Sequence, residues 1–105
     1  MIKDLSKEHY SATSVFMRLL PTIEEIGTEN LSTNEKIHKV DLLVSGELSK
    51  AMLTAVNEEG KSQISRDYII KVRKTIQRQS SISQVIKYIN NAIEAGKHYN
   101  TEQGE

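Results

Sequence analysis

The sequence predicts an all-α fold, a small bundle of four or five helices joined by short polar loops. Three observations of the 105-residue chain lead to this prediction. Apolar residues recur at spacings of three and four in several separate segments, which is the period of an amphipathic helix. Two segments begin with a Ser-x-x-Glu or Ser-x-x-Gln pattern, which is typical of helix N-termini. The chain contains one proline and five glycines, so few positions interrupt the helical pattern.

A first helix is expected to end near Leu20. Phe16 and Leu19 belong to an apolar pattern that continues beyond Leu20, but Pro21 interrupts it. Proline lacks the backbone N–H of a helix interior, whereas the first turn of a helix accepts it. We therefore expect a short second helix that starts with Pro21 and stops at Gly27.

A capping box marks the start of the next helix. Ser32 can accept a bond from the amide three residues on, and Glu35 can reach back to the amide of Ser32. Apolar residues then continue at helical spacing towards the turn at Gly60. Gly46 lies in the middle of this run, where a glycine costs about 1 kcal/mol relative to alanine. We therefore expect the helix to be kinked or split at Gly46.

A basic amphipathic helix is predicted over residues 66–79. Ile69, Val72 and Ile76 form its apolar stripe. Ser65 precedes the first helical residue, where a serine side chain caps the helix.

The last helix is expected to begin at a second capping box and to end at Gly96. Ser81 and Gln84 have the spacing of the box, and isoleucines and a valine follow at helical intervals. Beyond Gly96 the chain is polar and aperiodic. We therefore expect one helical domain over residues 1–96 and a flexible C-terminal tail over residues 97–105.

Composition excludes several classes of protein. The absence of cysteine excludes a disulfide framework, a thiolate zinc site and a cysteine nucleophile. The longest uninterrupted apolar runs contain three residues, whereas a membrane span needs about 20. The first ten residues contain no apolar segment typical of a secretory leader. We therefore expect a cytosolic protein that does not contact a membrane.

The histidines do not indicate an enzyme or a metal site. Glu35 and His38 form one Glu-x-x-His motif, which is half of the set that a di-iron bundle requires. His9 and His98 have no glutamate at the corresponding position. The chain also has no glycine-rich phosphate loop. We expect His38 and Asp41 to form a surface pair, and we predict no catalytic residue, cofactor or metal.

The small apolar core suggests self-association. Phe16 and four tyrosines are the aromatic residues of the chain, which has no tryptophan. Small scaffolds with a modest core need an additional source of stability. Because we expect neither a disulfide nor a metal, we predict that a homodimer provides this additional stability.

Charge is balanced over the whole chain but separated along it. Fourteen basic and fourteen acidic residues give a net charge of zero. Residues 1–60 carry a net charge of −4, and residues 61–105 carry +4. The basic excess lies on the predicted helix 61–78, opposite its apolar stripe or beside it. The candidate residues for binding nucleic acid or an acidic partner are Lys61, Ser62, Gln63, Arg66, Lys71, Arg73, Lys74 and Arg78.

Residues 47–79 resemble a helix-turn-helix pair of phage repressors and activators. The resemblance rests on the run Gln63-Ile64-Ser65-Arg66 at the start of the second helix. It implies that the beginning of this helix enters a DNA groove while later basic residues hold phosphates. The sequence departs from the pattern at the turn. Glu58 occupies the position of the turn glycine, and Asn57 and Glu59 occupy apolar positions.

Two functions follow from this reading. The first is a small non-enzymatic regulatory or interaction protein of a bacterial, phage or plasmid type, which binds a protein partner as a homodimer. The alternative is a helix-turn-helix-like transcriptional regulator that binds DNA through the basic helix 61–78. A third interpretation, an acidic first half that mimics nucleic acid, is weakened by its low density of ten acids in 60 residues.

Overall fold

The computed structural model describes residues 6–54 and 64–103, and the side chains of residues 8–54 and 64–98. The described residues form four helices and contain no strand. The helices are α1 (Ser6–Gly27), α2 (Thr33–Thr54), α3 (Arg66–Arg78) and α4 (Ile82–Gln103). The predicted all-α bundle is therefore confirmed, with four helices.

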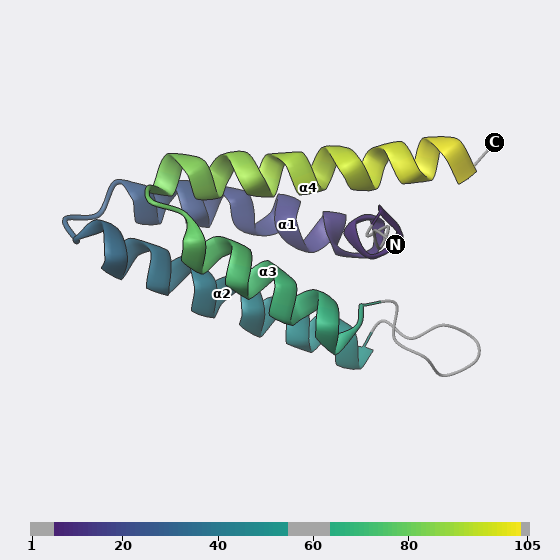
Figure 1. Ribbon diagram of the computed structural model, residues 1–105, viewed down its shortest axis with the longest axis horizontal. Helices are drawn as coiled ribbons and strands as arrows, with labels where there is room; N and C mark the ends of the chain where they lie inside the picture. Colours follow the sequence, from purple (N-terminus) through teal and green to yellow (C-terminus); the bar gives the residue numbers. More distant parts are fainter. Residues whose placement is uncertain (1–5, 55–63, 104–105) are drawn as a thin grey trace.

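The four helices form a bundle in which consecutive helices run in opposite directions (Figure 1). α1 packs along most of α4, and α2 packs against both α1 and α3. The backbones of α3 and α4 approach each other much less closely. One long edge of the bundle, between α3 and α4, is thus more open than the others.

α1 passes through Pro21 without a break, so the expected division into two helices is wrong. Pro21 lies on the exposed side of α1. The carbonyl of Met17, which loses its helical partner to the proline ring, is on this exposed side too. Water can therefore hydrate this carbonyl, and the buried positions Leu19 and Ile23 keep their packing on the other side.

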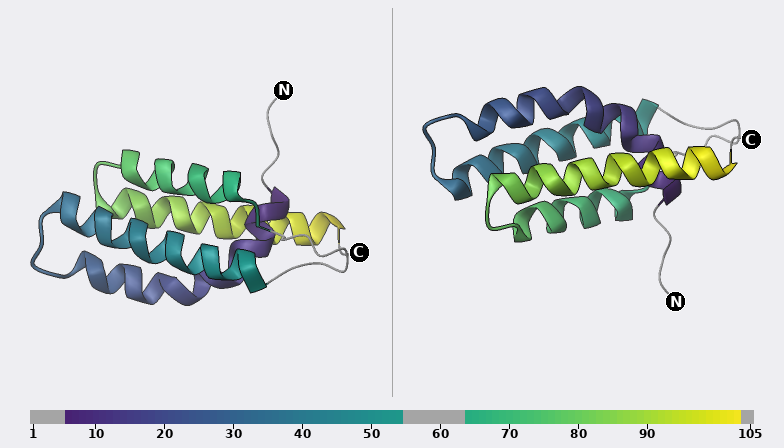
Figure 2. Two further views of the ribbon diagram at one scale, coloured as in Figure 1. Left: turned by 90° about the horizontal axis from the view of Figure 1, so that it is seen from below. Right: turned by 90° about the horizontal axis from the view of Figure 1, so that it is seen from above.

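The first turns of α1 bend away from the axis of the rest of the helix (Figure 2). Thr13 Oγ1 donates a hydrogen bond of 2.7 Å to the carbonyl oxygen of His9. A threonine bonded in this way to the preceding turn tends to bend a helix. The bend carries the beginning of α1 across the end of the bundle towards α3 (Figure 2).

The capping box of α2 is confirmed. The amide of Glu35 donates to Ser32 Oγ at 3.2 Å, and the amide of Ser32 donates to Glu35 Oε1 at 3.1 Å. The bond from the Ser32 amide is the main cause of the lowered pKa of the Glu35 carboxylate, and a side-chain hydrogen bond with Ser32 lowers it further. α2 also runs continuously through Gly46, so the expected kink or split is wrong. The continuation towards Gly60 lies outside the described residues.

The predicted starts of the last two helices are also confirmed. Ser65 caps α3 and accepts a bond of 3.0 Å from the amide of Tyr68. Ser81 Oγ accepts a bond of 3.2 Å from the amide of Gln84 at the start of α4. The second half of that box is displaced by one residue, because Gln84 Oε1 accepts from the amide and hydroxyl of Ser80.

The expectation that the last helix ends at Gly96 is wrong. α4 continues to Gln103 and thus includes residues 97–103 of the expected tail. Gly96 is buried against α1, where an added Cβ atom would lie 2.8 Å from the carbonyl oxygen of His9 and closer still to Thr13 Oγ1. The glycine is therefore a point of close helix contact and not a helix terminator.

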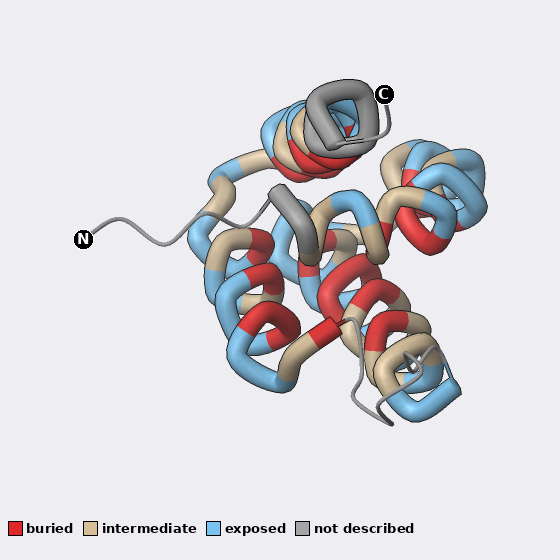
Figure 3. The backbone as a smooth tube through the Cα atoms, turned by 90° about the vertical axis from the view of Figure 1, so that its right-hand side faces the viewer, coloured by how far each residue is buried: buried red, intermediate tan, exposed pale blue. Residues whose placement is uncertain are grey.

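The core contains the predicted apolar stripes of all four helices. Buried residues lie on the sides of the helices that face one another, and exposed residues lie on the outside of the bundle (Figure 3). The largest fully buried side chains include Tyr68, Phe16, Ile23, Leu48, Ile64, Ile76 and Ile89. Among the described helices, none is both long and apolar enough to cross a membrane.

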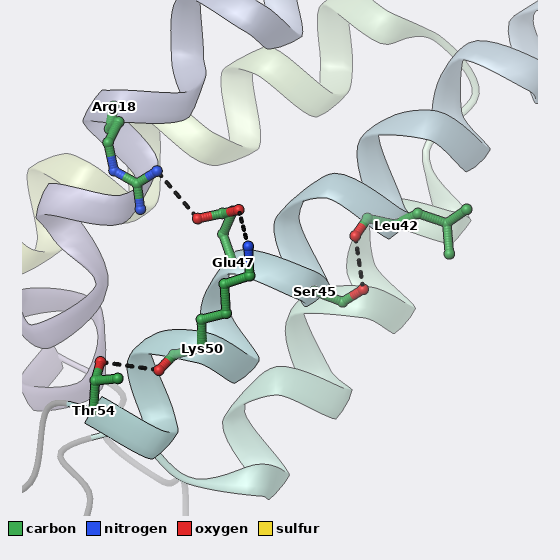
Figure 4. Close-up of polar contacts among 6 residues, drawn as sticks. All are labelled: Arg18, Leu42, Ser45, Glu47, Lys50 and Thr54. Carbon is green, nitrogen blue, oxygen red and sulfur yellow. Dashed lines mark hydrogen bonds and ion pairs between the residues drawn. The ribbon is translucent and has the colours of Figure 1, made fainter.

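A polar contact joins α1 to α2 on the outside of the bundle (Figure 4). Glu47 accepts a bond of 3.1 Å from Arg18 and lies 3.4 Å from Lys50. The bond from Arg18 is the main cause of the lowered pKa of Glu47. Exposed ion pairs of this kind contribute about 0.5 kcal/mol, so the bundle depends mainly on its apolar core.

Gly46 and Gly96, which both lie in helix interiors, should respond in opposite ways to substitution by alanine. Gly96→Ala should lower the free energy of unfolding by about 1–3 kcal/mol, because the new methyl group has no space. Gly46→Ala should raise it by about 1 kcal/mol, since an added Cβ meets nothing within 4 Å and alanine favours the helix. Urea unfolding measures both. A Gly96→Ala variant as stable as the original chain would contradict the close contact.

Candidate functional site

The side of α3 that faces α2 holds a buried carboxylate. Asp41 of α2 is 1% exposed. Arg73 donates to both of its oxygens at 3.2 Å, and Gln77 donates to Oδ2 at 3.0 Å. The contact with Asp41 raises the pKa of Arg73. Three hydrogen bonds from two side chains thus compensate for the burial of this charge.

This arrangement corrects two expectations. Asp41 does not form a surface pair with His38, because Asp41 is buried and His38 is exposed. Arg73 does not contribute to an unbroken cationic surface, because its guanidinium group is engaged by Asp41. The sequence holds a signal for the burial of Asp41, which follows Ile37 by four residues and precedes Val44 by three. Asp41 therefore shares the buried stripe of α2.

The opposite side of α3 forms the candidate site, a groove of about 340 Å³ that α1 and α4 help to line. We call it the cationic groove, because none of its lining residues is acidic and three of them are Lys or Arg. Lys71, Lys74 and Arg78 follow each other at spacings of three and four, so they share one face of α3. The complete lining is His9, Lys71, Val72, Lys74, Thr75, Arg78 and Tyr88.

The three cations of the groove are exposed. The structure gives Lys71, Lys74 and Arg78 no ion pair with any described acidic residue. Like charges at neighbouring positions on a helix destabilise it by a few tenths of a kcal/mol per pair. The groove therefore concentrates three cations that form no ion pair with a described acidic residue, although Asp67 lies one turn before Lys71 on the same face of α3.

The bent start of α1 closes one end of the groove. Glu8 Oε2 accepts bonds from the amide and the hydroxyl of Ser65, at 3.2 and 2.5 Å. His9 Nδ1 lies 2.6 Å from the hydroxyl oxygen of Tyr68. The two rings meet edge to face, with centroids 5.2 Å apart. These contacts fasten α1 to the first turn of α3 and fix the position of the His9 ring.

Two tyrosine hydroxyls near the groove stay protonated at neutral pH. Burial is the main cause of the raised pKa of Tyr68, and Tyr88 and Glu8 raise it further. Burial also raises the pKa of Tyr88, against the smaller opposite effect of its hydrogen bond with Thr75. Tyr88 and Thr75 are therefore neutral hydroxyl groups that can bond to a ligand in the groove.

A second, smaller cleft borders Lys74 on its other side. Ile70, Arg73, Lys74 and Gln77 line it. The Ile70 side chain is 41% exposed, so an apolar group lies directly beside the cations of α3. Lys74 is common to both hollows and forms the ridge between them.

The structure groups only part of the predicted site. Lys71, Lys74 and Arg78 line the cationic groove, Arg66 is exposed at the start of α3, and Arg73 faces α2. The remaining predicted residues, Lys61, Ser62 and Gln63, lie outside the described residues. His9 and Tyr88 were not predicted, because no sequence spacing indicates that α1 and α4 approach this side of α3. Thr75, which lies on α3 itself, is uncharged and was not among the predicted basic and N-terminal residues.

The pair α2 and α3 does not have the geometry expected of a helix-turn-helix. The two helices run antiparallel and side by side (Figures 1 and 2). In a DNA-binding helix-turn-helix the two helices cross at about 90–120°. Residues 47–79 therefore resemble a helix-turn-helix in sequence but do not show its helix crossing angle.

Neither a metal site nor a known relative points to another chemistry. Among the residues with described side chains, no three His, Asp or Glu residues gather in a way that could hold a metal ion. Comparisons with protein-family models, curated proteins and solved structures found no significant match. The cationic groove is thus the feature on which a functional proposal can be built.

Proposed function

We propose that this chain is a small non-enzymatic regulator, of a bacterial, phage or plasmid type, that binds an acidic segment of a partner protein. The observation that carries the proposal is the cationic groove, where Lys71, Lys74 and Arg78 form no ion pair with a described acidic residue. An acidic ligand would relieve the repulsion among the three cations and would form new ion pairs with them. A cytosolic setting is part of the proposal, in keeping with a chain that has no cysteine.

The spacing of the cations favours a linear ligand over a single anion. Lys71 and Arg78 are seven residues apart, which corresponds to about 10 Å along the helix axis. A single phosphate group is too small to contact both ends of this row. Carboxylates repeated along a helix or an extended segment cover this length.

The surroundings of the groove favour a protein partner over DNA. Ile70 is 41% exposed beside Lys74, and apolar side chains next to charged ones are typical of protein interfaces. The whole chain has no net charge and a pI near 6.8, whereas domains that bind nucleic acid are commonly strongly basic. The antiparallel packing of α2 and α3 gives no support to a helix-turn-helix mode of binding.

An acidic peptide tests the proposal. We expect a ten-residue peptide of aspartates with one central leucine to bind the chain, with an affinity that falls as salt is added. The triple variant Lys71→Gln, Lys74→Gln, Arg78→Gln should bind about tenfold more weakly. Three ion pairs of about 0.5 kcal/mol each together contribute about as much as the 1.4 kcal/mol of a tenfold change. Isothermal titration calorimetry measures both affinities.

A second triple variant controls for net charge. Lys39→Gln, Lys50→Gln, Lys87→Gln removes the same charge from exposed positions that do not line the groove. It should bind the peptide nearly as the original chain does. Equal weakening by both triple variants would contradict a specific groove. Tight binding of duplex DNA that the first triple variant abolishes, without peptide binding, would favour the DNA-binding alternative.

The homodimer is a second part of the proposal and involves α2. Leu42 and Leu53 are 53% and 76% exposed and lie about three turns apart on one face of α2. Gly46 lies between them, and nothing approaches the position of its missing Cβ. A second copy that covered this face would bury both leucines.

Light scattering tests the dimer. The chain should show about twice its 11.9 kDa mass, and Leu53→Gln should shift it to the monomer without loss of helix content. Met17→Gln, a matched change at an exposed position of α1, should leave the dimer intact. A mass near 12 kDa for the unmodified chain at high concentration would refute this part of the proposal.

A further inference from the structure

His9 also lines the cationic groove, and the proposed function gives it no role. It belongs to the bent first turns of α1 and lines the groove together with the three cations of α3. Imidazole has an ordinary pKa near 6.5 and thus changes its charge within the physiological range. The charge of the groove therefore depends on the protonation of this one ring.

The contact with Tyr68 holds the ring in place in both protonation states. Nδ1 lies 2.6 Å from the Tyr68 hydroxyl, which is fully buried and has a raised pKa through burial. The phenol donates to Nδ1 when the imidazole is neutral. When the imidazole is charged, Nδ1–H donates to the phenol oxygen. Protonation therefore adds a positive charge without loss of this bond.

The groups around His9 determine how protonation and ligand binding are linked. From α3, Lys71, Lys74 and Arg78 line the same groove, and from α4 the neutral Tyr88 does so. Glu8, next to His9 in α1, accepts two bonds from Ser65. Three cations beside the ring disfavour a fourth charge, whereas carboxylates bound in the groove favour it. By reciprocal linkage, a charged His9 binds an acidic ligand more tightly.

We infer that His9 is the fourth cationic contact of the groove and makes the binding of an acidic partner segment pH-dependent. The inference rests on the proposed function, since it requires that the groove binds an acidic segment. It follows from the position of His9 beside the three cations and from its fixed bond to Tyr68. The affinity rises as the pH falls through the range in which imidazole becomes charged.

The test is peptide binding by the full chain between pH 8 and pH 5.5 at constant ionic strength. The aspartate peptide described above stays largely ionised over this range, because aspartate has an ordinary pKa near 3.9. We expect the affinity of the unmodified chain to rise about twofold at the lower pH, the effect of one added exposed ion pair. His9→Gln should show no such rise, since glutamine can still bond to Tyr68 but cannot become charged.

His38→Gln is the matched control, because His38 is exposed on α2 and lines a different hollow. This variant should keep the full pH dependence. If His9→Gln fails to fold, the imidazole signals of the unmodified chain give a second readout by NMR. The titration midpoint of His9 should move to higher pH when the peptide saturates the groove.

The outcomes separate the two claims. Absence of peptide binding at every pH would overturn the proposed function and this inference with it. Peptide binding with an unchanged His9 midpoint would overturn the inference alone, as would a folded His9→Gln variant that keeps the pH dependence. In that case the three cations of α3 would still be the binding groups.

Discussion

The arrangement of this bundle depends on the close contact between α4 and α1 at Gly96. A side chain at this position would collide with the His9 carbonyl and with Thr13. Glycine lets α4 lie against the turn of α1 in which Thr13 bonds back to His9. The same turn is where the chain must leave the axis of α1 to reach α3. One small residue in α4 thus permits both the bend and the packing of α1 against α4, the most extensive contact between two described helices.

The bend places the groove. It brings Glu8 to the N-cap Ser65 and His9 to the buried Tyr68, so the start of α1 lies beside the open edge between α3 and α4. α3 is held from its other side by the ion pair between Arg73 and the buried Asp41. α3 is therefore fixed on both flanks. Lys71, Lys74 and Arg78 line the groove and form no ion pair with a described acidic residue. The backbone that carries these cations is thus in place before a ligand binds, and the ordering cost of binding falls on the long side chains.

Local signals predicted the helices well, whereas contacts between distant segments had to come from the structure. The caps at Ser32, Ser65 and Ser81 act over three residues, so the sequence alone indicates them. Pro21 and Gly96 misled the prediction for one reason. Their effect depends on what lies beside them: solvent around Pro21, and α1 against Gly96. Lys71, Lys74 and Arg78 could be predicted as a cationic face, but Arg73 could not be separated from them without knowing where α2 lies. His9 and Tyr88 join the site through tertiary packing, which no spacing in the sequence encodes.

The central claim is that the α3 face of the groove binds an acidic segment, and NMR mapping tests it most directly. An isotope-labelled chain would be titrated with the aspartate peptide while the amide signals are followed. The largest shift changes should fall on residues 71–78, with further changes at His9 and Tyr88. Changes concentrated on the exposed face of α2, or spread evenly over the lysines of the chain, would contradict the account.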